Sequence, residues 1–557
     1  MHDRRSFLIA GGAAVAGIAS VGAADDSAAK AFVEKHVQKM RPLEIAANNA
    51  WWNANTTGKD EDFAKKEAAQ NAIDAALAEP KTFAELKAIK DAGVTDKLLK
   101  RQIDLLYLMY LEKQLDPELL KKITAKANAV EKGFNVYRAV VDGKEMSDSQ
   151  VRRVLKESTN PGERKKVWEA SKGVGASVEA DLKELVALRN EAATKLGFKN
   201  FHTLMLFLNE QDGTELIALF DELDALTREP FLKAKAEIDE KLAQNCGIKV
   251  SELRPWHYQD PFFQESQAVF AVSIDEPYKT ADILKLCQEF YKGIGLPIDD
   301  VIARSDLFEK KGKSPHAFCT DIDREGDVRV LANIVPTEYW ASTMLHELGH
   351  AVYSSKNIPQ SVPYVLRDAA HILTTEGVAM QFQKFSKQRA WLEGMGVKVE
   401  NGKAFDETAA KMLRNELLIF SRWCQVMLRF EKSMYENPSQ DLNKLWWDLV
   451  EKYQAIVRPE GRNAPDYGSK IHICSAPVYY HNYMMGQLFA SQVHHALCRD
   501  ALKVEPRATT YIGEKKVGEF MKAKVFEPGR TLSWRDLTKF ATGEALSAKA
   551  FAKDFRE

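Results

Sequence analysis

The chain has 557 residues, of which 45% are hydrophobic and 28% are charged, so it can bury a large core and is not a disordered polymer. Its 78 Lys and Arg residues nearly balance its 79 Asp and Glu residues, which leaves a formal net charge of -1. Because the chain has no basic excess, it offers no general attraction for nucleic acid or for an anionic membrane surface.

The first 24 residues have the pattern of an export signal. Arg4 and Arg5 precede an apolar, Ala- and Gly-rich run that ends near Val21. This pattern predicts a twin-arginine signal peptide over residues 1–24, which directs a folded protein to a bacterial periplasm or out of the cell. The alternative is a frayed N-terminus or a weak anchor. No other run approaches about 18 consecutive apolar residues, so we expect no membrane association after signal cleavage.

Residues 25–557 are predicted to form a single, mostly helical domain. Apolar residues three and four apart recur up to about residue 226, for example at Leu99, Ile103 and Leu106, which is typical of amphipathic helices. No internal repeat and no Pro/Gly/Ser-rich hinge divides the chain. The six cysteines form no CxxC motif, which argues against a cysteine-rich metal cluster, and most are expected to be buried apolar side chains.

One segment has the pattern of a β-hairpin. Residues 317–322 and 328–335 are predicted as two short strands, joined by a turn at residues 324–327. Pro336 ends the second strand, and a helix is expected to follow toward Leu345. The edge of a lone hairpin is exposed unless another segment pairs with it, and an extended peptide could do so.

The helix after the hairpin contains a His-Glu-Leu-Gly-His motif, residues 346–350. Residues four apart lie on one face of a helix, so His346 and His350 can reach one metal ion, and Glu347 stands beside it, placed to take a proton from water. Zinc suits two neutral imidazoles, one carboxylate and an open fourth position, so we expect one Zn²⁺ per chain. The alternative is two satisfied histidines on a buried helix.

A third ligand is expected from a second helix, predicted over residues 369–380. Glu376 is the natural choice because it lies in an otherwise apolar stretch, where an isolated carboxylate would be costly to bury. Two alternatives stay open. Glu376 could be an exposed helix residue, and His371 is a rival ligand, although we expect His371 to support the other ligands instead.

A hydrolytic site also needs hydrogen-bond donors where negative charge develops on the substrate. Residues 466–483 concentrate a lysine, two histidines and several tyrosines, all of which can donate. On composition alone, core packing is the commoner role of such an aromatic stretch.

Together with the His-Glu-Leu-Gly-His motif and its distal glutamate, several stretches make the chain resemble the angiotensin-converting-enzyme family of gluzincin peptidases, also called the peptidyl-dipeptidase A family. These stretches are residues 50–56 (AWWNANT), 446–454 (WWDLVEKYQ), 466–472 (DYGSKIH), 480–483 (YHNY) and 494–498 (HHALC). They follow one another in the family's order and span most of the mature chain.

The resemblance implies a fold and a set of roles. The fold would be a mostly α, two-lobed helical ellipsoid with a deep central channel and a small hairpin beside the motif helix. The zinc ligands would be His346, His350 and Glu376. The catalytic residues would be Glu347 as general base and proton donor, with Tyr483 and His472 bonding the tetrahedral intermediate.

The resemblance also implies how a peptide is held. His316 and Ala317 would line the cleft, where the hairpin backbone bonds an extended peptide. Lys470 and Tyr480 would bind the C-terminal carboxylate of the substrate, helped by a glutamine near Trp256, for which we choose Gln259.

The chain departs from the family at four positions. Met380 stands where the family has an acidic residue supporting the metal ligands, so this support must differ. Asn482 replaces an arginine tied to chloride activation, so chloride dependence is not expected. Pro315 replaces a cysteine and Cys498 lacks its usual partner, so the family's disulfides are not expected.

These features predict a zinc metallopeptidase that releases dipeptides from the C-termini of short peptides. A carboxypeptidase or an oligoendopeptidase with the same zinc site is the nearer alternative, and a non-catalytic helical peptide-binding protein is the more distant one. We expect short peptides as substrates, a monomer, and no nucleic-acid or membrane partner.

Overall fold

The structure, a computed structural model, describes residues 26–267, 269 and 272–555. The predicted signal peptide, residues 1–24, lies outside these residues. The described chain consists of helices and two short antiparallel hairpins, which confirms the predicted mostly α fold class. None of the helices within the described ranges is long and apolar enough to cross a membrane.

The N-terminal part of the chain is helical except for one small hairpin. Its elements are α1 (Ser27–Thr57), α2 (Asp60–Leu77), α3 (Pro80–Ala92), α4 (Lys97–Glu112), α5 (Pro117–Val136), β1 (Ala139–Val141), β2 (Lys144–Met146), α6 (Asp148–Glu157), α7 (Pro161–Lys195), α8 (Phe201–Leu208) and α9 (Gly213–Cys246). Helix α4 illustrates how these helices form. Asp96 caps it by accepting the backbone N–H of Leu99 at 2.7 Å, and the predicted stripe buries Ile103, Leu106 and Tyr110.

The C-terminal part holds the second hairpin and the motif helix. Its elements are α10 (Ile283–Gly293), α11 (Asp299–Arg304), β3 (Phe318–Asp321), β4 (Val328–Leu331), α12 (Glu338–Val352), α13 (Ile372–Gln383), α14 (Arg389–Gly394), α15 (Gly402–Glu436), α16 (Leu442–Gln454), α17 (Ile471–Ser475), α18 (His481–Leu497), α19 (Lys515–Met521), α20 (Trp534–Thr542) and α21 (Lys549–Lys553). Short 3₁₀ and π turns connect them.

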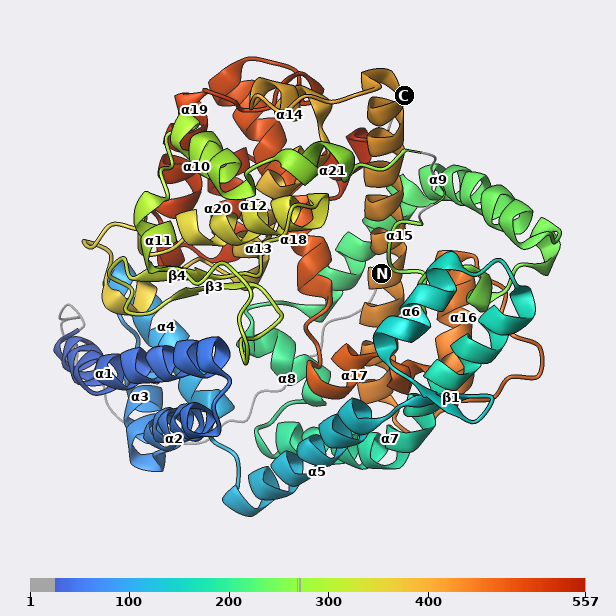
Figure 1. Cartoon of the computed structure of the whole chain (residues 1–557). Coiled ribbons are helices and arrows are strands. Elements are labelled where there is room, and N and C mark those ends of the chain that lie inside the picture. The colour runs from blue at the N-terminus through green and yellow to red at the C-terminus, as the bar shows by residue number, and fades with distance from the viewer. Residues whose placement is uncertain (1–25, 268, 270–271, 556–557) are drawn as a thin grey trace, which may run out of the picture.

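In Figure 1, α1 to α4 lie together below β3 and β4, and two further groups of helices can be seen. One group holds α10 to α14 and α19 to α21, with β3 and β4 at its margin, and the other holds α5 to α7, α16 and α17. Helices α15 and α18 run between the groups, and α18 packs against both α13 and α15. The two-lobed shape, the deep channel and the single-domain organisation stay predictions.

The predicted hairpin is present, with strands shorter than expected. Phe318 pairs with Leu331 and Asp321 with Val328, and the hairpin lies against α12 (Figure 1). The outer edge of β4 is covered, because Asp306 donates its backbone N–H to Val330 at 3.0 Å and accepts from Ala332 at 2.9 Å. Among the described residues no other backbone segment pairs with the outer edge of β3, so this edge is open except at its end, where the side chain of Asn48 donates to the carbonyls of Asp321 and Ile322 at 3.3 and 3.0 Å.

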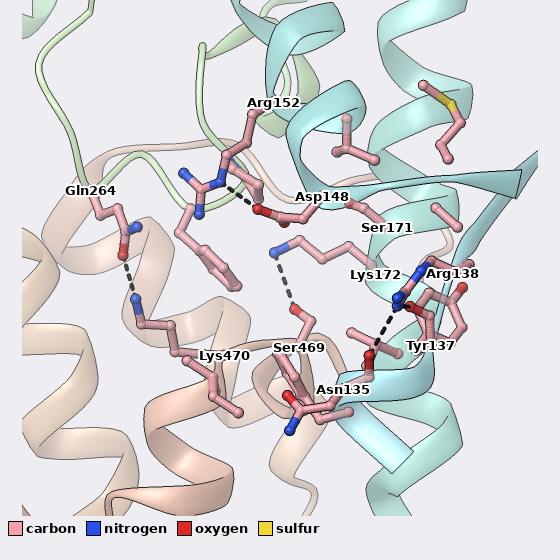
Figure 2. A pocket seen from close by; sticks show the side chains of 18 residues that line it. Asn135, Tyr137, Arg138, Asp148, Arg152, Ser171, Lys172, Gln264, Ser469 and Lys470 are labelled. Atoms are coloured by element: carbon pink, nitrogen blue, oxygen red, sulfur yellow. Dashed lines mark hydrogen bonds and ion pairs between the residues drawn. The ribbon is translucent and has the colours of Figure 1, made fainter. Parts of the chain in front are cut away.

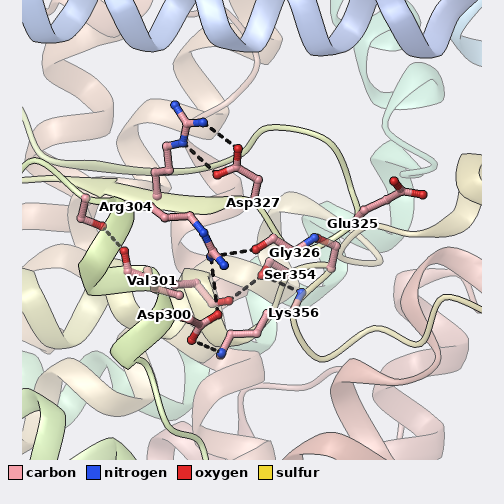
Figure 3. A network of polar contacts seen from close by, with 12 residues as sticks. Asp300, Val301, Arg304, Glu325, Gly326, Asp327, Ser354 and Lys356 are labelled. Carbon is pink, nitrogen blue, oxygen red and sulfur yellow. Dashed lines mark hydrogen bonds and ion pairs between the residues drawn. The ribbon is translucent and has the colours of Figure 1, made fainter.

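A polar network fixes the hairpin turn to the segment that follows α12 (Figure 3). Arg304 of α11 donates to the carbonyl of Gly326 at 3.0 Å. Asp300, which is also on α11, forms an ion pair with Lys356 from the segment after α12. Ser355 accepts the N–H of Gly326 at 2.8 Å. These contacts hold the hairpin in one position relative to the motif helix.

The cysteines follow the expectation for apolar side chains. All six are free, so none of the family's disulfides forms. Four of them, Cys287, Cys424, Cys474 and Cys498, are buried, and the other two are half-buried. This confirms that most of the cysteines are core residues.

Candidate metal centre

Three side chains from two helices converge on one point. His346 and His350 project from the same face of α12, and their Nε2 atoms lie 3.1 Å apart. Glu376 of α13 brings its carboxylate to 3.5 Å from the Nε2 atom of His346 and 4.0 Å from that of His350. All three ligand atoms lie within 4.8 Å of one another. Two nitrogens and a carboxylate oxygen at these spacings form a set that can hold one metal ion.

Each imidazole uses its other nitrogen for a second contact. The Nδ1 atom of His346 lies 2.6 Å from the side-chain oxygen of Gln383, and that of His350 lies 2.7 Å from the hydroxyl of Thr375. Such contacts orient metal-binding imidazoles and fix their tautomers. In the resembled family an acidic residue at the position of Met380 supports the metal ligands. Here Gln383 and Thr375 make contacts that can orient the two imidazoles instead. Sequence analysis missed both residues, although Gln383 lies two helical turns after Glu376 on the same face.

His371 has a different role from the one expected. Its Nδ1 atom accepts the backbone N–H of Leu373 at 3.1 Å, and its Nε2 atom lies 3.0 Å from the carbonyl of Asn209. It thus caps the N-terminus of α13, which begins at Ile372 rather than at residue 369. His371 does not contact the ligand histidines, so its predicted support of the ligands is wrong.

Glycines set the distance between the helices that carry the ligands. A Cβ atom on Gly349 would lie 2.7 Å from the Cα atom of Ala379, so α12 and α13 meet backbone to backbone there. A Cβ atom on Gly486 of α18 would lie 3.1 Å from the Cβ atom of Glu376. Because contacts this short leave no room for a side chain, the positions of the ligands depend on both glycines.

Burial determines the protonation of these groups. It lowers the pKa of His346 to about 4 and that of His350 well below its usual value, so both imidazoles are neutral and can donate a lone pair. Burial raises the pKa of Glu376 to about 7. Burial, together with the nearby Glu376, raises the pKa of Glu347 to about 8. Neutral imidazoles beside buried carboxylates fit a site that is completed by a cation.

Glu347 links the candidate metal centre to the hairpin. Its carboxylate accepts a hydrogen bond from the backbone N–H of Cys319 in β3, the strand with the open edge. His316, which is exposed, and Ala317, which is half-buried, directly precede this strand. The structure thus places both predicted cleft residues at the start of the strand that contacts Glu347.

The predicted donors form an aromatic cluster beside Glu376. The ring of His472 lies 4.9 Å from that of Tyr480 and 6.5 Å from that of Tyr483. Tyr479, which sequence analysis left without a role, stacks edge-on against Tyr483 at 5.2 Å. Burial and the charge of Glu376 raise the pKa of Tyr483, and burial lowers that of His472 to about 4. Both side chains are therefore neutral near pH 7, and the Tyr483 hydroxyl keeps its proton.

Lys470 lies at the far side of this cluster. Its ammonium group stands 5.2 Å from the ring of Tyr480 and donates to the side-chain oxygen of Gln264 at 2.6 Å. Gln264 thus occupies the place for which Gln259 was chosen. The backbone N–H of Gln259 donates instead to Gln267 at 2.6 Å. The loop that carries these glutamines has no helical or strand period from which their directions could be inferred.

Asn482 belongs to an uncharged group of three hydrogen-bonded polar side chains. Its side-chain oxygen accepts from Gln211 at 2.7 Å, and the oxygen of Gln211 lies 2.8 Å from the Nε2 atom of His481. Burial lowers the pKa of His481 to about 3, so this group of side chains carries no charge near pH 7. The position that is an arginine in the family is therefore filled here by uncharged groups.

A mostly helical fold in which a His-Glu-x-x-His helix meets a glutamate from the next long helix defines the gluzincin class of metallopeptidases. The chain belongs to the angiotensin-converting enzyme family, since the Peptidase_M2 family model, described as angiotensin-converting enzyme, matches residues 23–231 and 258–557.

Individual relatives are distant. The chain is 22% identical to the angiotensin-converting enzyme-like protein Ace3 of Mus musculus over 416 residues, which cover 69% of this chain and 56% of that protein. It is 23% identical to the angiotensin-converting enzyme of Rattus norvegicus over 443 residues, which cover 73% of this chain and 33% of that protein. The matches thus span about half or less of the length of these relatives.

Proposed function

We propose that this chain is a zinc peptidyl-dipeptidase, which releases dipeptides from the free C-termini of short peptides. The observation that carries the proposal is the convergence of His346, His350 and Glu376, with Glu347 beside them. A carboxylate in this position is the general base of peptidases that carry this motif, whereas a purely structural metal site has no need of one.

The residues fit a zinc ion by their chemistry. His346 and His350 are neutral, their Nδ1 atoms are engaged by Gln383 and Thr375, and Glu376 supplies one negative charge. Zinc, when bound by these ligands, would polarise the scissile carbonyl and lower the pKa of its water from 15.7 to about 7.

Glu347 would take a proton from the attacking water and later give it to the leaving amine. In the metal-free chain, burial and the nearby carboxylate of Glu376 raise the pKa of Glu347, a shift in the direction that lets the carboxyl group return the proton. The N–H of Cys319 holds the carboxylate in one orientation. The same strand offers its open edge to the substrate backbone, so we assign the binding of the extended peptide to His316, Ala317 and the residues after them.

The donors beside Glu376 would stabilise the charge that develops on the carbonyl oxygen. Tyr483 keeps its hydroxyl proton, and His472 is a neutral imidazole, so each can donate one hydrogen bond. Further along, Lys470, Gln264 and Tyr480 would bind the terminal carboxylate of the peptide. An anchor at a fixed distance from the metal sets the position of the cleaved bond, which is why we infer release of a dipeptide.

The first experiment asks whether the metal centre is catalytic. We expect purified protein to hold one zinc per chain, and Glu347→Gln to keep the metal while hydrolysis falls by about 10² to 10⁴. Glu393→Gln, a change at a partly exposed residue of α14, is the control. Hydrolysis at the original rate in Glu347→Gln would remove Glu347 from the mechanism, and absence of metal from active protein would remove the metal.

The second experiment identifies the cleaved bond. Mass spectrometry of products from a series of unblocked peptides should show loss of C-terminal dipeptides, and amidation of the C-terminus should slow cleavage. Release of single residues would identify a carboxypeptidase, and equal cleavage of amidated peptides an oligoendopeptidase. Lys470→Met should raise KM for free peptides and leave KM for amidated peptides unchanged.

We further propose that the chain is exported through the twin-arginine pathway. The proposal rests on Arg4 and Arg5 ahead of the apolar run. Replacing both arginines with lysine should keep the protein in the cytoplasm, which fractionation of cells would measure.

A further inference from the structure

A pocket of about 350 Å³ opens beside Lys470, on the side away from the aromatic cluster. Its walls come from α5 to α7, the loop at residues 261–264 and the start of α17, as Figure 2 shows. The charged side chains that line it are Arg138, Asp148, Arg152, Lys172 and Lys470. Cations therefore outnumber carboxylates in its lining.

Lys172 is the most buried of these cations. Its side chain projects from α7, the residue is only 3% exposed, and its ammonium group donates to the hydroxyl of Ser469 at 3.2 Å (Figure 2). The same ammonium group stands 3.3 Å from the centroid of the Phe262 ring. A lysine this deeply buried usually has a carboxylate partner, since burying an unpaired charge is costly.

The carboxylates near Lys172 and Lys470 are already engaged. Among the described residues, neither ammonium group has a carboxylate within ion-pair distance. Asp466 is held by Arg462 through two contacts of 2.7 and 2.6 Å, and Asp260 accepts the backbone N–H groups that follow it in its loop. Burial lowers the pKa of Lys172 to about 7 and that of Lys470 to about 8.

The remaining charges of the lining leave the pocket positive. Arg152 pairs with Asp148 at 2.8 Å and with Glu265 at 3.1 Å, so its charge is matched. Within the part of the chain that the structure describes, Arg138 donates to the backbone carbonyls of Asn135 and Tyr137, at 2.9 and 2.7 Å, and to no carboxylate. Its charge adds to those of the two lysines.

The ammonium groups of Lys172 and Lys470 both lie near one aromatic ring, that of Phe262. Phe262 lies 3.3 Å from the ammonium group of Lys172 and 5.5 Å from that of Lys470, measured to the ring centroid. Two cations that line one pocket, without carboxylates of their own, match a ligand that carries two negative groups on one residue.

We propose that this pocket binds the side-chain carboxylate of an acidic C-terminal residue, with Lys172 as its cation. Ser469, which donates its own proton to the carbonyl of Asp466 at 2.5 Å, accepts from the Lys172 ammonium group and orients it. Lys470 would hold the main-chain carboxylate of the same residue. The inference rests on the proposed function and deepens it, because it names peptides that end in glutamate or aspartate as the preferred substrates. The ligand carboxylates would supply the negative charge that the two buried lysines lack.

The test compares two peptides that differ only in ending with glutamate or with its neutral isostere, glutamine. For the wild-type enzyme, we expect kcat/KM to be about tenfold higher for the glutamate peptide, the effect of one additional charge-assisted hydrogen bond. In Lys172→Met this ratio should fall to near one. Lys166→Met, a change at an exposed lysine of the same helix, is the matched control and should keep the ratio.

Two outcomes would overturn the inference. A ratio near one in the wild-type enzyme, with acetate stimulating both peptides alike, would identify the pocket as a site for free anions. If the glutamate-to-glutamine ratio of kcat/KM stays near ten in Lys172→Met, another residue binds the acidic side chain. If Lys172→Met does not fold, Lys172→Gln with the same measurement replaces it.

Equilibrium binding separates this inference from the proposed function. We expect the Glu347→Gln protein to bind the dipeptide Ala-Glu about tenfold more tightly than Ala-Gln in titration calorimetry. If no peptide releases a dipeptide but Ala-Glu still binds more tightly than Ala-Gln, the proposed dipeptide release is wrong and the assignment of the pocket stands. If dipeptides are released and the preference is absent, the pocket assignment is wrong and the proposed function stands.

Discussion

The Nδ1 atom of His346 lies 2.6 Å from the side-chain oxygen of Gln383, so a neutral amide orients one of the candidate metal ligands. Because an amide oxygen can only accept, the imidazole must carry its proton on Nδ1, which leaves the Nε2 lone pair directed toward His350 and Glu376. The contact joins α12 to α13 across the centre.

Replacing Gln383 should weaken metal binding. We expect Gln383→Ala to lower zinc affinity about 10- to 100-fold, since the imidazole of His346 loses the partner that fixes its tautomer. Competition with a chelator of known affinity measures the change. Gln70→Ala, at an exposed position on α2, should bind zinc like the wild type, and equal affinity in both variants would show that Gln383 does not position the ligand.

The two tyrosines beside Glu376 should differ in their effect on catalysis. Tyr483→Phe removes a proposed donor to the carbonyl oxygen, so we expect kcat to fall about 10² to 10³ with little change in KM. Tyr479→Phe keeps the ring that packs 5.2 Å from Tyr483 and removes only the hydroxyl that is hydrogen-bonded to Tyr483, so it should cost less than about tenfold. Steady-state kinetics on one unblocked peptide measures both. A larger loss in Tyr479→Phe than in Tyr483→Phe would reverse the assignment.

Asp321 should affect substrate binding through the hairpin. Its carboxylate accepts the backbone N–H groups of Arg324 and Ser355, each at 2.9 Å, and so joins the hairpin turn to the segment after α12. Asp321→Ala should destabilise the protein by about 1–3 kcal/mol and raise KM, since the strand that offers its edge is no longer fixed.

Asp323→Ala is the matched control for that experiment. It removes hydrogen bonds to Glu325 and Asp327 within the same turn, but leaves the link to Ser355. Thermal unfolding and peptide KM measure both variants. If KM rose equally in the two, the turn itself and not its attachment would govern binding.

Glu431 should make the metal-free protein less stable as the pH rises. It is buried on α15, its carboxyl accepts the backbone N–H of Val478 at 3.0 Å, and burial raises its pKa from 4.5 to about 8. Since the folded pKa lies above the unfolded one, the folded state binds the extra proton between these values. The stability from this group is complete below about pH 4.5 and is lost as the pH passes 8.

Glu431→Gln should therefore flatten the pH dependence of stability. We expect the loss in unfolding free energy between pH 5 and 8 to be smaller than in the wild type by at least about 1 kcal/mol. Urea unfolding at several pH values measures it. Glu436→Gln, at the end of the same helix, should retain the wild-type profile, and an unchanged profile in Glu431→Gln would assign the dependence to other groups.

The parts of the site with a regular period could be predicted from the sequence. His346 and His350 are four apart on a helix, and Glu376 lies in an apolar helical stretch, so their faces follow from the geometry of the helix. The same period places Gln383 two turns after Glu376, and could have indicated it. The hairpin was predictable because two short strand-like runs flank the turn at residues 324–327, although β4 ends at Leu331 and not at Pro336.

Residues outside regular elements could not be predicted in this way. Gln264 reaches Lys470 from a loop whose path depends on Asp260. The carboxylate of Asp260 accepts the backbone N–H groups of Phe262, Gln264 and Glu265, which no sequence period encodes. His371 was misjudged because a histidine before a helix resembles a ligand in sequence, while its cap and its contact with Asn209 depend on tertiary structure. One pocket brings together Lys172 and Lys470, which lie almost three hundred residues apart in the sequence.

The missing side chain at Gly349 has a consequence for other members of the family. Alanine at this position would clash with the main chain of Ala379 and displace the helix that bears Glu376. The sequence of the ligand residues would nevertheless be unchanged. Such a homologue would fold, match the motif and bind zinc poorly. The residue at this one position would therefore distinguish homologues with a functional metal centre from homologues that carry the motif but bind zinc poorly.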